Sequence, residues 1–196
     1  MLRRPVSLSG VARTKKGRGE SVEITFHVVG AGTRLMARRK EGQTIDCLGP
    51  LGNGFDLHPE KTALLIAGGA GIAPLRWVAE ELRRLKTEVY LLAGARSVKD
   101  FPYAVVSGKG KRTITPFVDE EDDHKLVTDL VRRRLPELEG EGRDIQAYAV
   151  GPRPMLQALV EVLPKDIPCQ VSLEERMACG IGACRGCVIE VGSARP

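Results

Sequence analysis

Three cysteines near the C-terminal end of the sequence are its residues best suited to chemistry. Cys179, Cys184 and Cys187 lie in the stretch ERMACGIGACRGC, residues 175–187, and glycines separate them. The C-x4-C-x2-C spacing is typical of a plant-type ferredoxin loop, in which a more distant fourth cysteine completes the ligands of a [2Fe–2S] cluster. Glycines let such a loop wrap the cluster and direct backbone N–H groups at its sulfur atoms. The spacing therefore predicts an iron–sulfur site.

Two alternatives stay open for these thiols. Structural zinc prefers paired C-x2-C units or mixtures of Cys and His, and the nearest histidine is His124. Inert thiols are the other alternative. Cys47 and Cys169 lie outside the loop, and we interpret each of them as a buried core thiol rather than a ligand.

Two glycine turns farther upstream indicate a nucleotide site. The segment GGAGIAPL, residues 68–75, follows a predicted strand and opens a predicted helix. Such a turn lets the backbone approach a phosphate, and the start of the helix offers free N–H groups. It lacks the G-x-G-x-x-G pattern, so a plain strand-to-helix turn is the alternative. The segment AVGPRPML, residues 149–156, ends a later predicted strand, and ligands of open α/β sheets lie at such ends.

The elements that must position these sites change in character near Lys61. Before it, residues 1–58 favour β structure. Apolar and polar residues alternate over 21–29, which predicts a strand, and a second short strand is predicted over 43–50. A short helix is predicted over 33–40.

Residues 61–165 alternate between buried strands and amphipathic helices. Continuous apolar runs and helical spacing predict strands over 61–69, 87–96 and 145–152 and helices over 73–86, 126–135 and 153–163. Strand–helix–strand order implies parallel strands joined by right-handed crossovers. We therefore predict a doubly wound α/β domain, with the acidic run 118–124 as an exposed loop.

Composition limits the partners and the compartment. The formal net charge of the 196 residues is only +5, and the short basic runs at 13–18, 37–40 and 132–134 lack an accompanying aromatic pattern, so we expect no nucleic-acid binding. No apolar run is long enough to span a bilayer, so we expect no membrane segment. The N-terminal residues show no signal peptide, which makes the cytoplasm the expected compartment. Reducing conditions there favour metal or redox roles for clustered cysteines over disulfides.

Taken together, the segments resemble one known family in their order along the whole chain. RRPVS (3–7), HVVGAGT (27–33), LGPLGNGF (48–55), the two glycine turns and SLEERMACGIGACRGC (172–187) are similar to the motifs of the electron-transfer subunit of NAD-dependent, class 1B dihydroorotate dehydrogenase. That family belongs to the ferredoxin–NADP reductase superfamily. The cysteine stretch is the most specific part of the resemblance.

The resemblance implies a fold class of α/β plus β in three parts. We expect an incomplete flavin-binding β-barrel over 1–58, a nucleotide-binding domain over 59–168 and an iron–sulfur segment over 169–196. In the family, this subunit passes electrons from NADH through FAD and a [2Fe–2S] cluster to an FMN-containing catalytic subunit in pyrimidine biosynthesis. The implied assembly is a heterotetramer with two copies of each subunit.

The resemblance also assigns roles to individual residues, although it indicates no catalytic residue. Arg4 would contact the FAD pyrophosphate, and Ser7 would lie near the flavin ring. The full set implied to bind FAD or NADH is Arg4, Pro5, Val6, Ser7, Thr25, Phe26, His27, Gly32, Thr33, Gly69, Gly71 and Gly151. Within it, residues 25–27 would line the flavin, 32–33 would hold its phosphates, and the last three glycines would border the nicotinamide nucleotide. Cys179, Cys184 and Cys187 would hold the cluster.

Three departures from the family pattern qualify these expectations. Almost nothing precedes Arg4, although the family's barrel begins with several strands before that segment. Val150 stands where the family usually has a cysteine, which affects the expected hydride site. The fourth cluster cysteine would fall beyond Pro196. The sequence thus leads us to expect a chain that is cut at both ends.

Two other functions remain as alternatives. A related flavin and iron–sulfur subunit of a hydrogenase, sulfide dehydrogenase or transhydrogenase would share the reductase core. A truncated nucleotide-binding module without electron transfer would explain the missing barrel strands and the missing fourth ligand.

Overall fold

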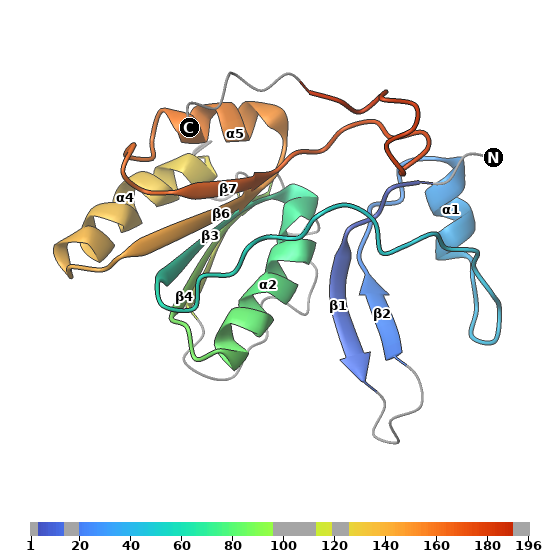
Figure 1. Ribbon diagram of the computed structural model, residues 1–196, viewed down its shortest axis with the longest axis horizontal. Coiled ribbons are helices and arrows are strands. Elements are labelled where there is room, and N and C mark those ends of the chain that lie inside the picture. Colours follow the sequence, from blue (N-terminus) through green and yellow to red (C-terminus); the bar gives the residue numbers. More distant parts are fainter. Residues whose placement is uncertain (1–3, 14–19, 96–112, 119–125, 190–196) are drawn as a thin grey trace. The chain divides into compact units, whose positions relative to one another are not determined.

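The computed structural model describes residues 4–13, 20–95, 113–118 and 126–189, and its chain forms two compact units (Figure 1). The first unit combines Met1–Val6, Phe26–Gly54 and Glu175–Pro196. The second unit combines Ser7–Thr25 and Phe55–Glu174. The predicted cysteine loop belongs to the first unit, and both glycine turns belong to the second.

A five-stranded parallel sheet forms the centre of the second unit, in the order β5-β4-β3-β6-β7. Its strands are β3 (Thr62–Gly68), β4 (Val89–Ala95), β5 (Thr113–Val118), β6 (Ile145–Val150) and β7 (Cys169–Ser172). In the central strands β3 and β6 nearly every residue is buried, because helices cover both faces of a parallel sheet. From β3 the chain adds β4 and β5 toward one edge of the sheet, and it then returns to add β6 and β7 on the other side of β3. The strand order therefore reverses between β3 and β6.

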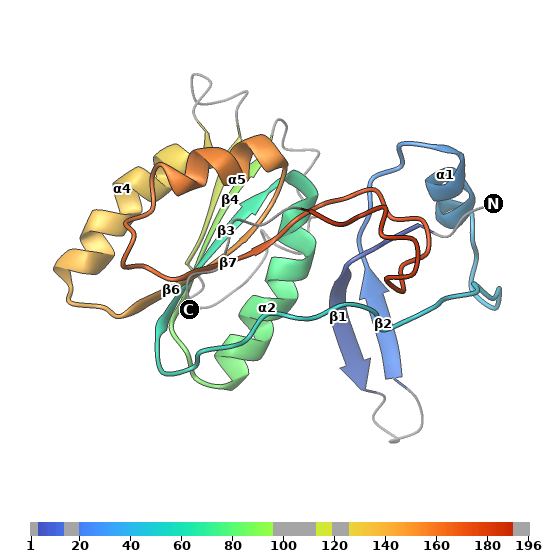
Figure 2. The same ribbon diagram turned by 45° about the horizontal axis from the view of Figure 1, so that its top comes forward.

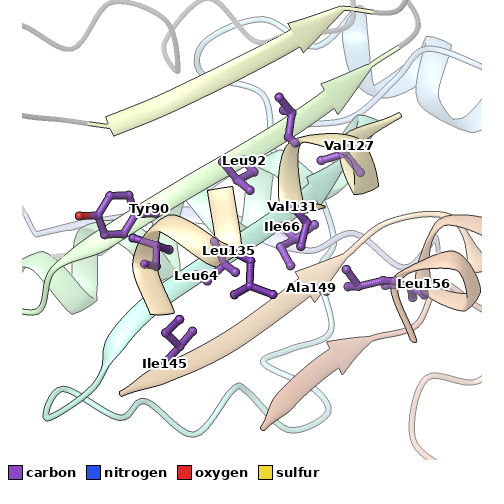
Figure 3. Packing of buried hydrophobic residues seen from close by; sticks show 13 residues of the cluster. Leu64, Ile66, Tyr90, Leu92, Val127, Val131, Leu135, Ile145, Ala149 and Leu156 are labelled. Atoms are coloured by element: carbon purple, nitrogen blue, oxygen red, sulfur yellow. The ribbon is translucent and has the colours of Figure 1, made fainter. Parts of the chain in front are cut away.

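Helices lie on both faces of this sheet, which confirms the doubly wound prediction (Figure 2). Helix α2 (Ile72–Arg84) packs on one face, and α4 (Val127–Gly140) and α5 (Arg153–Val160) pack on the other. A short 3-10 turn, η1 (Gly69–Gly71), joins β3 to α2. On the α4 side, Leu64, Ile66 and Leu92 of the sheet meet Val131 and Leu135 of the helix (Figure 3).

An antiparallel hairpin of β1 (Leu8–Arg13) and β2 (Glu20–Ile24) completes the second unit and contacts helix α2. The register of the hairpin is irregular between Leu8 and Gly10. The strand predicted over 21–29 is shorter than expected. It is present as β2, which ends at Ile24, and the residues after Ile24 leave the hairpin. The predicted short helix is present as α1 (Ala31–Ala37) in the first unit.

The strand predicted over 43–50 was wrong. Those residues adopt no strand, and their apolar side chains Ile45 and Leu48 remain about half exposed, so no burial holds an extended segment in a sheet. Strands β1, β5 and β7 were not predicted. Strand β5 carries Pro116 and lies at a sheet edge, where a missing N–H is tolerated. Most of the acidic run 118–124 lies outside the described residues, as does His124.

Candidate cofactor sites

The carboxyl ends of β3 and β6 lie side by side because these parallel strands are neighbours in register. A Cβ added to Gly68 would lie 2.4 Å from Met155 Sδ, and one added to Gly151 would lie 3.2 Å from the Gly68 Cα. A side chain at either position would have to displace the thioether of Met155, and at Gly151 it would also press against the Gly68 backbone. The predicted nucleotide edge is a place where two backbones approach closely.

The turn between β3 and α2 is equally restricted. Gly69 has a φ of +52°, and a Cβ added to Gly71 would lie 2.2 Å from the Val150 carbonyl oxygen. The left-handed conformation and the close approach each favour glycine. The turn thus places the start of α2 against the end of β6. As a result, Gly69, Gly71 and Gly151 all lie at the carboxyl edge of the sheet.

Val150, the residue that departs from the family pattern, ends β6 and is 3% exposed. It belongs to the core cluster on the α2 side of the sheet, together with Ile72 and Leu75. Its side chain therefore contributes to packing, and it offers no thiol at this edge.

The residues expected to hold the FAD phosphates form a small group within the first unit. A Cβ built on Gly32 would lie 3.6 Å from both Cγ and Nε of Arg4, so the Arg4 side chain passes directly over this glycine. The Thr33 hydroxyl accepts the N–H groups of Val29 and Gly30, at 3.0 and 3.1 Å, and donates to the Gly30 carbonyl at 3.2 Å. These three bonds use its single hydrogen and both lone pairs. Thr33 therefore shapes the turn through its side chain, and its backbone N–H and Arg4 are what a phosphate would contact.

The residues expected near the flavin ring fall into both units. Ser7 and His27 are exposed, whereas Thr25 and Phe26 are partly buried. Of the remaining R-P-x-S residues, Pro5 is exposed and Val6 is partly buried.

A chain of polar contacts in the second unit begins at Thr25. The Thr25 hydroxyl donates to Ser9 Oγ at 3.1 Å, and Ser9 Oγ donates to Glu23 Oε1 at 3.2 Å. The same carboxylate accepts from Arg76 Nη2 of helix α2 at 2.6 Å. Ser9 is 1% exposed, so its hydroxyl needs both partners.

The cysteine loop turns sharply at residues in the left-handed region. Gly180, Gly182 and Arg185 have φ angles of +70°, +78° and +51°. These turns direct the Cys184 N–H toward Cys179 Sγ, with an N–S distance of 3.4 Å. Backbone hydrogen bonds from Cys184 and Ile181 lower the pKa of the Cys179 thiol to about 6.

The donor set of this loop fits an iron–sulfur cluster. Thiolates are the ligands that such clusters require, and N–H groups aimed at sulfur stabilise them. Cys179 and Cys187 are partly exposed and Cys184 is exposed. Over the described residues, no three His, Cys, Asp or Glu side chains are gathered as closely as a bound metal ion would hold them. The loop brings Cys179 and the Cys184 backbone together, but the three thiols are not yet convergent.

The two cysteines outside the loop differ from each other. Cys169, in β7, packs against the core on the α4 side, and burial raises the pKa of its thiol to about 11. It packs against the core, as predicted, although it is partly rather than fully buried. Cys47 is exposed, so its prediction as a core thiol was wrong, because the strand that was expected to bury it does not form.

Some residues of these sites were not anticipated from the sequence. Met155 packs against Gly68 and Gly151, and its contact with Gly68 exists only because the distant strands β3 and β6 pair. The contact between Glu23 and Arg76 joins residues 53 positions apart. In the sequence, nothing distinguishes Glu23 or Arg76 from an ordinary exposed charged residue.

Comparisons with known families agree with these two sites. The chain matches the oxidoreductase NAD-binding domain over residues 65–161, which include both glycine turns. It also matches the iron–sulfur cluster binding domain of dihydroorotate dehydrogenase B over residues 174–195, which include the cysteine loop. The cofactors expected from the sequence, NAD(H), FAD and a [2Fe–2S] cluster, are supported by these matches and by the reductase fold.

Several relatives are similar over nearly the whole chain. The dihydroorotate dehydrogenase B (NAD(+)) electron transfer subunit of Caldanaerobacter subterraneus subsp. tengcongensis is 37% identical, covering 97% of this chain and 71% of that protein. The subunit of the same name from Fusobacterium nucleatum is 38% identical, covering 96% and 71%.

Solved structures show the same fold. The NADH-dependent reduced ferredoxin–NADP oxidoreductase, studied for flavin-based electron bifurcation, aligns with a TM-score of 0.70 at 27% identity; the alignment covers 95% of this chain and 66% of that one. CYP116B46 from Tepidiphilus thermophilus aligns with a TM-score of 0.60 at 22% identity over 86% of this chain and 22% of that one, which supports the fold alone. No helix in the described part of the chain is long and apolar enough to cross a membrane.

Proposed function

This chain belongs to the family of electron transfer subunits of dihydroorotate dehydrogenase B (NAD(+)), and from that membership we propose how its residues serve electron transfer. It is an oxidoreductase subunit. When bound, FAD accepts an electron pair as hydride from NADH and releases single electrons, which is what a [2Fe–2S] cluster can accept. The protein's own part is to bind and orient these groups.

The nicotinamide nucleotide binds at the carboxyl edge of β3 and β6. Gly69 and Gly71 hold the start of α2 at this edge, where its free N–H groups and positive dipole end favour a phosphate. Gly151 keeps the neighbouring strand end free of side chain. With Val150 at the end of β6, hydride transfer depends on how the nicotinamide is positioned, without help from a thiol at this place.

FAD binds to the R-P-x-S segment and to the residues after β2. The guanidinium of Arg4, which lies over Gly32, pairs with the pyrophosphate, since it can donate two parallel hydrogen bonds to phosphate oxygens. The backbone at Gly32 and Thr33 completes the phosphate contact. Ser7 and the residues 25–27, with Pro5 and Val6 in support, line the flavin.

Cys179, Cys184 and Cys187 ligate the [2Fe–2S] cluster, and the cluster is the exit for electrons. Because the three thiols are only partly assembled, binding of the cluster would order the loop further, as metal binding commonly couples to folding. When bound there, the cluster would supply one-electron transfer to an FMN-containing catalytic subunit, which would oxidise dihydroorotate in pyrimidine biosynthesis. We propose an assembly of two copies of each subunit in the cytoplasm, and we keep the division 1–58, 59–168 and 169–196 for the flavin, nucleotide and cluster parts.

The observation that carries this proposal is the cysteine loop with its left-handed turns, lying inside residues 174–195 of the matched cluster-binding domain. The test uses the full-length protein purified under anaerobic conditions and reconstituted with FAD, iron and sulfide. We expect flavin and iron–sulfur absorption bands, bleaching of both by NADH, and an electron paramagnetic resonance signal of a reduced [2Fe–2S] centre.

The same protein, mixed with the FMN-containing catalytic subunit, should then support dihydroorotate-dependent reduction of NAD(+). Bound zinc without iron after reconstitution would contradict the cluster assignment. A reduced cluster that passes no electrons to that subunit, but reduces a hydrogenase or transhydrogenase partner, would favour the alternative subunit families.

A further inference from the structure

One residue of the cysteine loop holds a backbone conformation that its own side chain disfavours. Arg185 has a φ of +51°, and a residue with a Cβ is strained in this left-handed region. The other two left-handed positions of the loop are occupied by Gly180 and Gly182, where no Cβ opposes the conformation. Glycine would therefore suit position 185 as well, yet the sequence has an arginine there.

The local backbone does not account for this arginine. Among the described residues, Lys86 is the other non-glycine residue with a positive φ. It directly follows the C-cap of α2 at Leu85, where helices commonly end in the left-handed region. Arg185 instead follows a series of bends and begins a turn, in which its carbonyl accepts the Val188 N–H at 3.3 Å. Glycine would form that backbone hydrogen bond equally well.

The Arg185 side chain is left without a partner of its own. It is exposed, and within the described part of the chain it forms no ion pair and no side-chain hydrogen bond. By contrast, Arg76, Arg134 and Arg143 each contact a carboxylate. Backbone strain is typically retained where function requires the residue. The side chain of Arg185 is therefore available for a contact outside this chain.

The residues around Arg185 have the composition of a protein interface. Ile181 and Val188, in the same loop, are 63% and 71% exposed. Exposed apolar side chains close together typically mark an interaction site, and arginine is enriched among the residues that dominate binding energy. We call Ile181, Arg185 and Val188 the loop surface.

Charge favours an acidic partner for this surface. The described part of the first unit, residues 4–6, 26–54 and 175–189, has seven Arg and Lys residues against three Asp and Glu residues, a net charge of +4. A cationic surface attracts an anionic partner and speeds its association. Arg185 also lies between two proposed ligands, Cys184 and Cys187, so a protein that approaches the cluster at these ligands meets its guanidinium.

We propose that the loop surface is the docking site for the electron-accepting subunit, and that Arg185 pairs there with a carboxylate of that subunit. The inference rests on the proposed function, in which the cluster is the exit for electrons toward an FMN-containing subunit. A guanidinium can donate two parallel hydrogen bonds to one carboxylate. Ile181 and Val188 exclude water around this pair, which strengthens it.

The test measures binding of the full-length protein, reconstituted with FAD, iron and sulfide, to the FMN-containing catalytic subunit at several salt concentrations. Arg185→Gly removes the charge and also the backbone strain, so the loop should keep iron and sulfide at the parent level or above. We expect the dissociation constant to rise about fivefold to thirtyfold and to depend less steeply on salt. Arg185→Lys should recover part of the affinity, because it restores the charge without the bidentate geometry.

Arg39→Ala is the matched control, because Arg39 is also exposed and belongs to the first unit but lies outside the loop. It should bind the catalytic subunit as the parent does. An equal loss of affinity in Arg39→Ala and Arg185→Gly would reflect overall charge and overturn the docking contact.

Three other outcomes would also overturn it. The first is equal affinity in Arg185→Gly and the parent. The second is a loss of iron and sulfide in Arg185→Gly, which would assign the side chain to the loop itself. The third is a change in sedimentation of the protein alone, which would make a second copy of this chain the occupant. A parent that holds its cluster but forms no complex with the catalytic subunit contradicts the proposed function itself, so the two failures are distinguishable.

Discussion

The two units of this protein are stabilised in different ways. The buried apolar side chains of the described chain, from Ala63 to Leu159, all belong to the second unit. In the described part of the first unit, residues 4–6, 26–54 and 175–189, no residue is buried. The hydrophobic effect therefore stabilises the second unit directly, whereas the described part of the first unit is held by turns and local hydrogen bonds, and we expect bound cofactors to add to its order.

This difference indicates how each unit should respond to change. A packed sheet resists loss of a ligand but not a change of volume in its core. A cofactor-dependent loop responds in the opposite way, because the bound group supplies much of its order. The predictions below test this contrast in turn, beginning with the largest expected effect.

The substitution Cys184→Ser should abolish the cluster. If each of the three thiolates ligates the cluster, as we propose, iron and acid-labile sulfide will fall together to background, and the electron paramagnetic resonance signal of the reduced protein will disappear. Cys179→Ser and Cys187→Ser should behave alike. Thermal unfolding of the sheet should change little, because the loop contributes no buried side chain.

Cys47→Ser and Cys169→Ser are the controls, since neither residue belongs to the loop. Both should retain iron and sulfide at the parent level. A normal cluster in Cys184→Ser would contradict the ligand assignment.

The substitution Arg4→Ala should weaken FAD binding about tenfold to a hundredfold, because a charge-assisted hydrogen bond contributes about 1.5–3 kcal/mol. The measurement is FAD titration of the deflavinated protein at constant salt. Arg39→Ala is the control, since Arg39 is exposed and lies after α1. Equal affinity in both variants would exclude a phosphate role for Arg4.

The substitution Gly71→Ala tests the packed side of the contrast. The added Cβ would meet the Val150 carbonyl oxygen at 2.2 Å, so we expect the free energy of unfolding to fall by about 1–3 kcal/mol, and NADH affinity to fall with it. The measurement is urea unfolding monitored by circular dichroism. Gly140→Ala, in α4 with open space around it, should leave stability unchanged or raise it by up to about 1 kcal/mol.

The substitution Tyr148→Phe removes a hydroxyl that joins the segment after Gly54 to the sheet. This hydroxyl accepts from the His58 N–H at 3.0 Å and donates to the Asp56 carbonyl at 3.2 Å. We expect a loss of about 1 kcal/mol in the free energy of unfolding, with cluster content unchanged. Tyr90→Phe, which loses only a hydrogen bond to the exposed Glu88, should reduce the free energy of unfolding by less. A larger loss in Tyr90→Phe than in Tyr148→Phe would contradict a stabilising role for the Tyr148 hydroxyl.

The smallest expected effect concerns thiol reactivity outside the loop. The thiolate is the reactive form, and burial raises the pKa of the Cys169 thiol above its ordinary range, to about 11. A raised pKa for an acidic group means that its contribution to stability is complete below pH ~9 and is lost as the pH rises toward ~11. At pH 8 we expect iodoacetamide to modify the exposed Cys47 and to spare Cys169, as measured by mass spectrometry of the holoprotein. Equal labelling of the two residues would show that β7 opens readily.

How much of this protein could be predicted depended on the range of the interactions involved. The strands and helices of the sheet were predicted because continuous apolar runs and helical spacing are local signals of burial. The cysteine loop was predicted as a cluster site because its three cysteines lie within nine residues, so their spacing could be compared directly with that of a ferredoxin loop. The glycine turns were predicted for the same reason.

Only the tertiary structure decided the features that join distant segments. The edge strand β5 escaped prediction because Pro116 weakens its pattern, and β7 because four residues carry little periodicity. The exposure of Cys47 followed from a strand that lacks burial to hold it. The requirement for glycine at position 71 comes from a carbonyl 79 residues away, at Val150. The run of hydrogen bonds from Thr25 through Ser9 and Glu23 to Arg76 exists because the β1–β2 hairpin lies on helix α2. Sequence patterns record which residues prefer burial and which can bind a metal, but close approach and hydrogen-bond direction arise only when the fold brings remote backbone segments together.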